Sequence, residues 1–206
     1  MPETRFNLLT EPLLNVRLQD RTERWCSLPD VLSLLAQGSV EAFLALQPHQ
    51  THAWHAFLVQ LAAMAMHKAG LAAIPSKSDE WLSLLRGMTE NRDEPWCLVV
   101  EDLALPAFFQ SPVPEGNLCS MDENSFPDVI DILATAKNHD VKSARIAYSL
   151  PQHWIYALTS LQTMHGVYGR GKYGITRMNS GYGSRPSVSF CTDLDWNRRF
   201  TREVDI

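Results

Sequence analysis

The sequence contains no long apolar run. None of its stretches approaches the ~18 consecutive uncharged apolar residues that a membrane-spanning helix needs. Its first residues, Met1-Pro2-Glu3-Thr4-Arg5, also lack the basic-then-apolar order of a secretory signal. We therefore expect a cytoplasmic protein with no membrane partner.

Cysteine is scarce as well. The four cysteines are far apart in the sequence and none belongs to a C-x-x-C pair: Cys26, Cys97, Cys119 and Cys191. This spacing indicates neither a zinc ribbon nor a disulfide framework. Internal repeats and low-complexity tracts are also missing, and we expect no cofactor and no bound metal.

Acidic residues are few in the C-terminal third of the chain. Residues 137–202 hold 10 Lys/Arg against only Asp140, Asp193 and Asp195, whereas residues 1–136 hold 8 Lys/Arg against 18 Asp/Glu. A basic block of this kind is typical of a surface that binds a polyanion. Solvated basic surfaces without a nucleic-acid ligand are the alternative.

The rest of the chain predicts one domain of class α+β. With 206 residues, 45% of them hydrophobic, the chain can bury a core over residues 1–206. The expected architecture is a mixed globular domain with several helices, short β-strands or hairpins, and long loops. Apolar spacing, caps and turn residues predict the following elements: a hairpin or pair of short strands around the polar stretch 17–23; helices over 27–38, 52–70, 78–87 and 151–165; a buried strand over 96–100 and another near 188–190; a long loop over 105–127; and a polar tail over 193–206.

The most unusual segment is residues 166–186, G-V-Y-G-R-G-K-Y-G-I-T-R-M-N-S-G-Y-G-S-R-P. It holds six of the ten glycines and four cations, Arg170, Lys172, Arg177 and Arg185, with no acid. Glycine lets a backbone approach a ligand closely, and Arg and Lys supply donors for phosphate. Tyrosines at 168, 173 and 182 add rings on which a base or sugar could pack.

Two nucleotide-binding motifs match this segment incompletely. Gly169, Gly171 and Gly174 satisfy G-x-G-x-x-G, but a helix is predicted before them, where a dinucleotide site needs a strand. Gly166, Gly171 and Lys172 satisfy G-x-x-x-x-G-K, yet Tyr173 stands where a P-loop needs Ser or Thr. We therefore favour neither motif, and a glycine-rich connection with solvated cations remains an alternative.

Six short stretches, spread over most of the chain, form a recognisable series: Asn7-Leu8-Leu9 with Pro12, Pro48-His49-Gln50 with Trp54-His55, Pro106-Ala107-Phe108, Lys137-Asn138-His139-Asp140, Leu161-Gln162-Thr163, and Gly174 to Pro186. In these stretches and in their order, the chain resembles the N-terminal portion of the large subunit (CasA family) of the type I-E Cascade CRISPR surveillance complex.

This resemblance implies a non-catalytic subunit of an RNA-guided antiviral defence complex. In that family the N-terminal α/β region reads the protospacer-adjacent motif of double-stranded DNA from the minor groove through a glycine-bearing loop. The implied nucleic-acid-binding residues are Gly169, Arg170, Gly171, Lys172, Tyr173, Gly174, Arg177, Asn179 and Arg185, with Lys137, Asn138, His139 and Lys142 toward guide RNA and neighbouring subunits. The implied partners are guide RNA, target DNA, the other Cascade subunits and the helicase-nuclease effector.

The family's subunit is longer than this chain. Its reading lysine, its glutamine wedge and a C-terminal four-helix bundle would all lie beyond the position of Ile206, so we expect that bundle to be absent here. The motif preference, the glycine that contacts the groove, and effector recruitment are not fixed by the sequence.

Two other classes of function stay open. His49, His52 and His55 recur every three residues, so a metal-dependent nuclease or hydrolase could use them. However, helical zinc sites pair histidines at i and i+4, and no acid lies among these three. The chain could also be a purely structural assembly protein. No nucleophile elbow or cysteine-protease signature is present, so we expect no enzyme.

Overall fold

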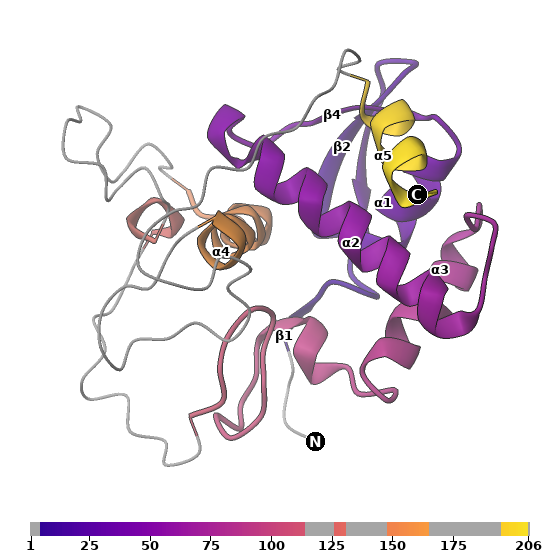
Figure 1. Cartoon of the computed structure of the whole chain (residues 1–206). Helices are drawn as coiled ribbons and strands as arrows, with labels where there is room; N and C mark the ends of the chain where they lie inside the picture. Colours follow the sequence, from indigo (N-terminus) through magenta and orange to yellow (C-terminus); the bar gives the residue numbers. More distant parts are fainter. Residues whose placement is uncertain (1–4, 114–125, 131–147, 165–194, 206) are drawn as a thin grey trace.

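The computed structural model describes residues 5–113, 126–130, 148–164 and 195–205. A long helix, α2 (Thr51–Ala69), crosses the molecule, and the other helices and a small sheet lie around it (Figure 1). The described residues form five α-helices and two small sheets, which confirms the α+β class. Among these helices, α2 included, none combines the length and the apolar character that crossing a membrane would take.

The larger sheet contains the predicted hairpin. Strands β2 (Leu14–Leu18) and β3 (Glu23–Cys26) pair antiparallel, and β4 (Val40–Phe43) adds to the other edge of β2. The turn is closed by Asp20, whose Oδ1 accepts from the Thr22 amide at 2.9 Å. Arg21 beside it has φ of 68°. An Asx-type turn explains why the polar stretch separates two strands.

Helix α1 (Leu28–Ala36) begins where the sequence predicts. The Ser27 amide donates to Asp30 Oδ2 at 3.0 Å and the Ser27 hydroxyl accepts from the Asp30 amide at 3.3 Å, a capping box. Gly38 follows the helix with φ of 76°, the left-handed conformation that glycine adopts readily. Leu28, Leu32 and Leu35 are fully buried against the core.

Helix α2 also ends at a left-handed glycine, and the 3-10 helix η1 (Pro48–Gln50) precedes it. Helix α3 (Ser78–Met88) ends one residue after Gly87, close to the predicted end. Glycine costs a helix only about 1 kcal/mol and does not stop it. The chain leaves the helical path at Glu90 and Asn91, both with positive φ.

The second sheet pairs β1 (Arg5–Asn7) with β5 (Cys97–Val99), antiparallel. The prediction of a buried strand over 96–100 is only partly correct. Trp96 belongs to the 3-10 helix η2 (Glu94–Trp96), and Val99 is 45% exposed. Cys97 and Leu98 are both buried, so the strand is buried over its first two residues and becomes exposed at Val99. The described parts of the predicted long loop, residues 105–113 and 126–127, contain only one isolated bridge, Ala107 with Gln110, before the 3-10 helix η3 (Pro127–Val129).

Aromatic rings fill the centre of the core. Trp54 of α2 is fully buried, and its ring lies edge-on to Phe43 of β4 at 5.8 Å and to Tyr156 of α4 (Pro151–Met164) at 5.0 Å. Such T-shaped pairs contribute about 0.5–1.5 kcal/mol each beyond their burial. One core cluster runs from Leu8 to Val204 and so joins elements from both ends of the chain.

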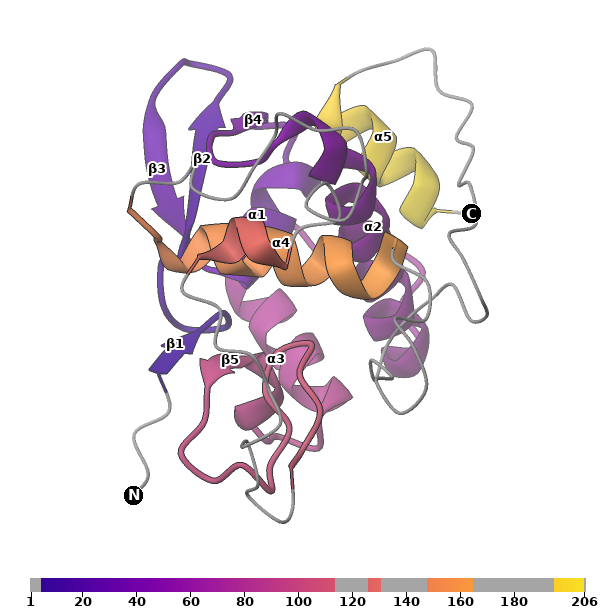
Figure 2. The ribbon, with the colours of Figure 1, turned by 90° about the vertical axis from the view of Figure 1, so that its left-hand side faces the viewer.

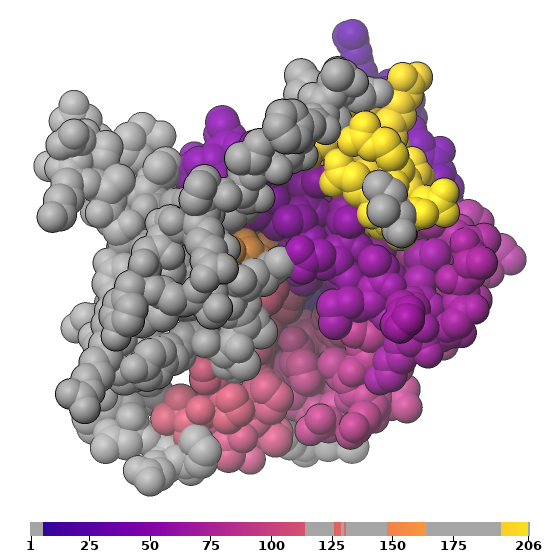
Figure 3. All heavy atoms as spheres, in the orientation of Figure 1, coloured from indigo at the N-terminus to yellow at the C-terminus, as the bar shows by residue number. Residues whose placement is uncertain are grey.

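The predicted polar tail is wrong: the chain forms helix α5 (Trp196–Val204). Asp195 caps it by accepting from the Arg198 amide at 2.9 Å. Phe200 is fully buried and Val204 nearly so, and Trp196 packs against the core at the same four-residue spacing. The charged residues between these three hid that spacing. Figure 3 shows α5 lying directly on α2.

Asn197 ties α5 to the edge of the sheet. Its Oδ1 accepts from the Val40 amide at 3.0 Å and its Nδ2 donates to the Val40 carbonyl at 2.8 Å, so the buried side chain pairs with β4 as a strand would. Gln19, which is exposed, donates to the same carbonyl at 3.0 Å. If Asn197 is removed, the Val40 carbonyl keeps its bond from Gln19, whereas the Val40 amide loses its bond to Asn197.

Replacing Asn197 with alanine is expected to lower the free energy of unfolding by about 2–3 kcal/mol, because a buried amide loses its acceptor. Gln19→Ala removes a bond to the same carbonyl from an exposed position and is expected to cost below about 1 kcal/mol. Urea unfolding of the two variants measures both. Equal losses would mean that Asn197 acts no differently from a surface amide.

Candidate nucleic-acid interface

The residues predicted to bind nucleic acid lie outside the described residues. This holds for Gly169, Arg170, Gly171, Lys172, Tyr173, Gly174, Arg177, Asn179 and Arg185, and also for Lys137, Asn138, His139 and Lys142. The predicted strand near residues 188–190 is outside them too. The structure describes the elements from which these two segments start and to which they return.

Helix α4 lies between the two segments in the sequence. Residues 131–147 connect η3 to the start of α4, and residues 165–194 connect the end of α4 to α5. A helix of 14 residues at 1.5 Å per residue separates its two ends by about 20 Å. The candidate guide-RNA segment and the candidate DNA segment therefore join opposite ends of one helix.

Helix α4 is held firmly. Ile155, Tyr156 and Ala157 are almost completely buried, and α4 packs on α2 with η3 lying against it (Figure 2). Burial raises the pKa of the Tyr156 hydroxyl, so it stays protonated. Near one end Gln152 Oε1 accepts from the Asn15 amide at 3.0 Å. Near the other, Gln162 Nε2 donates to the Phe109 carbonyl at 2.9 Å.

The helix before the glycine-rich segment matters for the two phosphate motifs. Helix α4 ends at Met164, two residues before Gly166, as the sequence predicts. Dinucleotide sites and P-loops both require a β-strand at that position. The structural context therefore argues against both motifs.

The other anchor of the segment, α5, is fixed by an ionisable pair. His55 of α2 is buried, and its Nε2 lies 2.8 Å from Glu203 Oε2 of α5. Burial lowers the pKa of His55, although the hydrogen bond to Glu203 opposes that effect. The pKa of Glu203 is lowered too. Burial alone would raise it, but the hydrogen bonds from His55 and Arg202 outweigh that effect. A neutral imidazole that donates Nε2–H to a carboxylate fits both directions.

This pair predicts loss of stability in acid. A histidine whose pKa is lower in the folded chain binds more protons when unfolded, so stability falls as pH drops below about 6.5. The lowered pKa of Glu203 adds a loss of the same sign at lower pH. His153, whose burial lowers its pKa, contributes in the same direction.

We expect His55→Gln to lose less stability than the wild type between pH 7 and pH 5, because the amide keeps the bond to Glu203 without taking up a proton. Chemical denaturation at several pH values measures the slope. His67→Gln, at the exposed end of the same helix, serves as the control and should keep the wild-type slope. An unchanged slope in His55→Gln would contradict this assignment.

The three histidines do not come together as a site. His55 is directed at Glu203, His52 is exposed on the same helix, and His49 lies in η1. Within the described ranges no three His, Cys, Asp or Glu side chains are grouped so that they could hold a metal ion. The structure therefore pairs His55 with Glu203 of α5.

Several of the residues that carry the family resemblance serve the core. Asn7 Oδ1 accepts from the Leu9 amide at 2.8 Å, and Leu8 and Leu9 are buried. The Phe108 amide donates to the Cys97 carbonyl at 2.8 Å, and the adjacent Phe109 carbonyl accepts from Gln162. Gln162 of the quoted motif Leu161-Gln162-Thr163 therefore bonds to the residue that follows Pro106-Ala107-Phe108.

No family model, curated protein or solved structure matches this chain. The family resemblance therefore rests on the residues quoted above, on their order and on the composition of residues 166–186.

The sequence analysis did not predict α5, whose N-cap Asp195 directly follows residues 165–194. It also missed the partnership of His55 with Glu203, because 148 positions separate the two residues. The Asp195 cap and the spacing of Trp196, Phe200 and Val204 were the signals in the sequence that could have located the helix.

Proposed function

We propose that the chain is a non-catalytic, nucleic-acid-binding subunit of an RNA-guided CRISPR defence complex of the Cascade type. The observation that carries the proposal is the composition of residues 166–186, with six glycines, four cations and no acid. The resemblance to the CasA large subunit supplies the biological setting, in which this segment contributes to reading the protospacer-adjacent motif.

The chemistry of the segment suits contact with a duplex. Arginine and lysine neutralise phosphates without reading sequence, and these contacts set position and affinity. Glycines allow the backbone to reach base edges in the minor groove, whose degenerate pattern lets one contact accept several sequences. The second basic segment, Lys137 to Arg145, would contact guide RNA or neighbouring subunits, as the resemblance implies.

The framework supports a binding role. Both helices that flank residues 165–194 pack on α2, through Tyr156 against Trp54 in α4 and through Glu203 with His55 in α5. Anchors that are fixed in this way hold both ends of residues 165–194 in place on the domain.

Salt dependence separates this function from that of a purely structural assembly protein. Binding to duplex DNA should weaken steeply as salt rises, with a log–log slope of about −0.9 for each phosphate that the protein neutralises. Fluorescence anisotropy on one labelled duplex between 50 and 200 mM salt measures it, and about a 10³-fold loss is expected for six phosphates. A slope near zero, or no binding at the lowest salt, would favour the structural role.

A further inference from the structure

Arg199 of α5 is a buried cation without a partner. The residue is only 7% exposed. Arginine is almost never buried to this extent unless an opposite charge pairs with it. Within the described ranges, however, the Arg199 guanidinium forms no ion pair and donates no hydrogen bond. Loss of a proton cannot relieve this situation, because a guanidinium stays charged at every physiological pH. The fold therefore holds an uncompensated positive charge at this position.

Arg199 lies on the side of α5 that meets α2. Trp196, three residues earlier, packs its ring edge-on to the His55 ring with the centroids 5.8 Å apart. Glu203, four residues later, places Oε2 at 2.8 Å from His55 Nε2. Residues three and four apart are neighbours on one side of a helix. The Arg199 side chain therefore belongs to the contact between α5 and α2 (Figure 1).

The two carboxylates one turn away on α5 are already engaged. Glu203 Oε2 is bonded to His55, and Oε1 accepts from Arg202 Nη2 at 3.0 Å. Asp195 caps the helix: its Oδ1 accepts from a backbone amide at 2.9 Å and its Oδ2 from a side-chain amide of the first turn at 3.4 Å. Because all four oxygens have partners, neither acid pairs with Arg199.

The end of the Arg199 side chain is accessible although the rest is buried. Of the guanidinium nitrogens, Nε alone is both fully buried and without a partner, so Nη1 and Nη2 reach the surface. A guanidinium presents its N–H groups as a rigid fork that matches two oxygens of an anion. Such hydrogen bonds are stronger where water is partly excluded. The fork at Arg199 is therefore preformed for an anion that approaches from solvent.

The charge of Arg199 also acts on the neighbouring pair. It lowers the pKa values of His55 and Glu203, in addition to the larger effects of burial and of hydrogen bonding. The other charged group that acts on His55 is His52 on its own helix. An anion bound at Arg199 would cancel the arginine charge, so the pKa of His55 would rise. This change gives a readout of binding that is separate from the arginine itself.

We propose that Arg199 is the centre of an oxyanion site at the contact between α5 and α2, and that its ligand is a phosphate group. A tetrahedral phosphate presents two oxygens to the fork in several orientations and keeps the others in water, whereas a carboxylate has only one pair to offer. The phosphate can be free or part of a nucleic-acid backbone, since the chemistry at Arg199 is the same. The site goes beyond the proposed function and does not depend on it.

Nuclear magnetic resonance on the isotope-labelled full-length chain tests the proposal. Sodium phosphate, sodium acetate and sodium chloride are titrated separately at matched ionic strength, while the Arg199 Nε–H signal and the His55 ring signals are followed. We expect a saturable shift of Arg199 with phosphate, a weaker one with acetate and none that saturates with chloride. The pKa of His55 should rise in phosphate. A DNA duplex that shifts the Arg199 signal at lower concentration identifies a nucleic-acid backbone as the source, and a duplex without effect identifies free phosphate.

Two methionine variants complete the test. Arg199→Met should abolish the response of His55 to phosphate. In chloride buffer it should unfold at the same or a higher urea concentration than the wild type, because replacing an unpaired buried charge with an apolar side chain is neutral or stabilising. Phosphate should raise the urea midpoint of the wild type and not that of Arg199→Met. Arg198→Met makes the same charge change on the exposed side of α5 and should keep both phosphate effects.

Four results would overturn the proposal. A chloride shift equal to the phosphate shift would mean an adventitious ion only, and tighter binding of acetate would exclude phosphate as the ligand. A lower urea midpoint of Arg199→Met in chloride would show that Arg199 stabilises the chain itself. Loss of the phosphate effects in Arg198→Met would indicate a general basic surface. The Arg170 and Lys172 double-alanine variant should bind free phosphate as the wild type does, so a failure of duplex binding alone concerns only the proposed function.

Discussion

Replacing Phe200 with alanine is expected to lower the free energy of unfolding by about 3–5 kcal/mol, the usual cost of truncating a buried phenylalanine. Phe200 is fully buried in the core and is the central apolar residue of α5, between Trp196 and Val204. The helix has nine residues, too short to persist in water without packing. Loss of this ring should therefore detach α5 from α2 as well as create a cavity.

Arg202→Ala is the matched control on the same helix. Arg202 lies on the exposed side and its Nη2 contacts Glu203 Oε1 at 3.0 Å, an exposed pair that contributes at most about 1 kcal/mol. Urea unfolding gives the loss for each variant, and far-ultraviolet circular dichroism reports whether helix content falls. A loss below about 1 kcal/mol for Phe200→Ala would show that α5 is not part of the core.

The second large effect concerns the glycine-rich residues 166–186. Replacing Arg170 and Lys172 together with alanine is expected to weaken binding to every duplex, about 10- to 100-fold at low salt, because under the proposed function each side chain would donate a charge-assisted hydrogen bond to phosphate. The salt slope should become shallower by about 0.9 for each phosphate that the variant no longer neutralises. Lys68→Ala, which removes a cation from α2, should change neither quantity.

Glycine substitutions should act differently. A bulky residue at Gly171 or Gly174 would keep every cation but stop the backbone from approaching base edges. We expect the largest losses on duplexes that carry the preferred motif and small losses on others. Anisotropy titrations on a panel of duplexes measure both patterns. Equal losses on all duplexes would count against readout in the minor groove.

The sequence predicts the elements whose signals are local. Ser27 and Asp30 mark the start of α1, and the turn at Asp20 separates β2 from β3 without reference to the rest of the chain. Gly70 ends α2 as its position suggests, because a glycine takes the left-handed conformation there without strain. In each case a few neighbouring residues decide the outcome.

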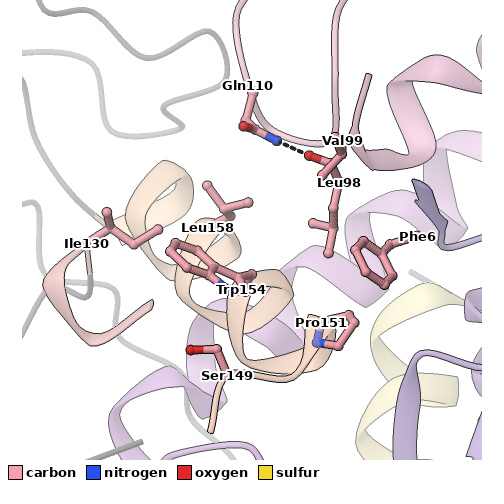
Figure 4. Close-up of a pocket in the computed structure, with 9 residues that line it drawn as sticks. All are labelled: Phe6, Leu98, Val99, Gln110, Ile130, Ser149, Pro151, Trp154 and Leu158. Carbon is pink, nitrogen blue, oxygen red and sulfur yellow. Dashed lines mark hydrogen bonds between the residues drawn. The ribbon is translucent and has the colours of Figure 1, made fainter. Parts of the chain in front are cut away.

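Features that depend on distant residues could not be predicted in this way. Helix α5 is rich in charge, and it is stabilised by Phe200 in the core and by Asn197 on Val40, which is 157 positions away. A cavity beside α4 also draws its walls from separate elements, among them β1, β5 and α4 (Figure 4). The candidate binding residues in 131–147 and 165–194 lie outside the described residues, so their roles stay predictions from composition and resemblance.

We propose that this chain adds motif-dependent DNA recognition to an RNA-guided complex. The most direct test is to assemble the guide-RNA complex with and without the chain and to measure binding to duplexes that differ only beside the target. If the account is correct, the chain confers a preference for particular adjacent sequences, and the Arg170 and Lys172 double variant weakens binding to all of them. A chain that joins the complex but leaves every duplex bound equally well with and without it would contradict the account.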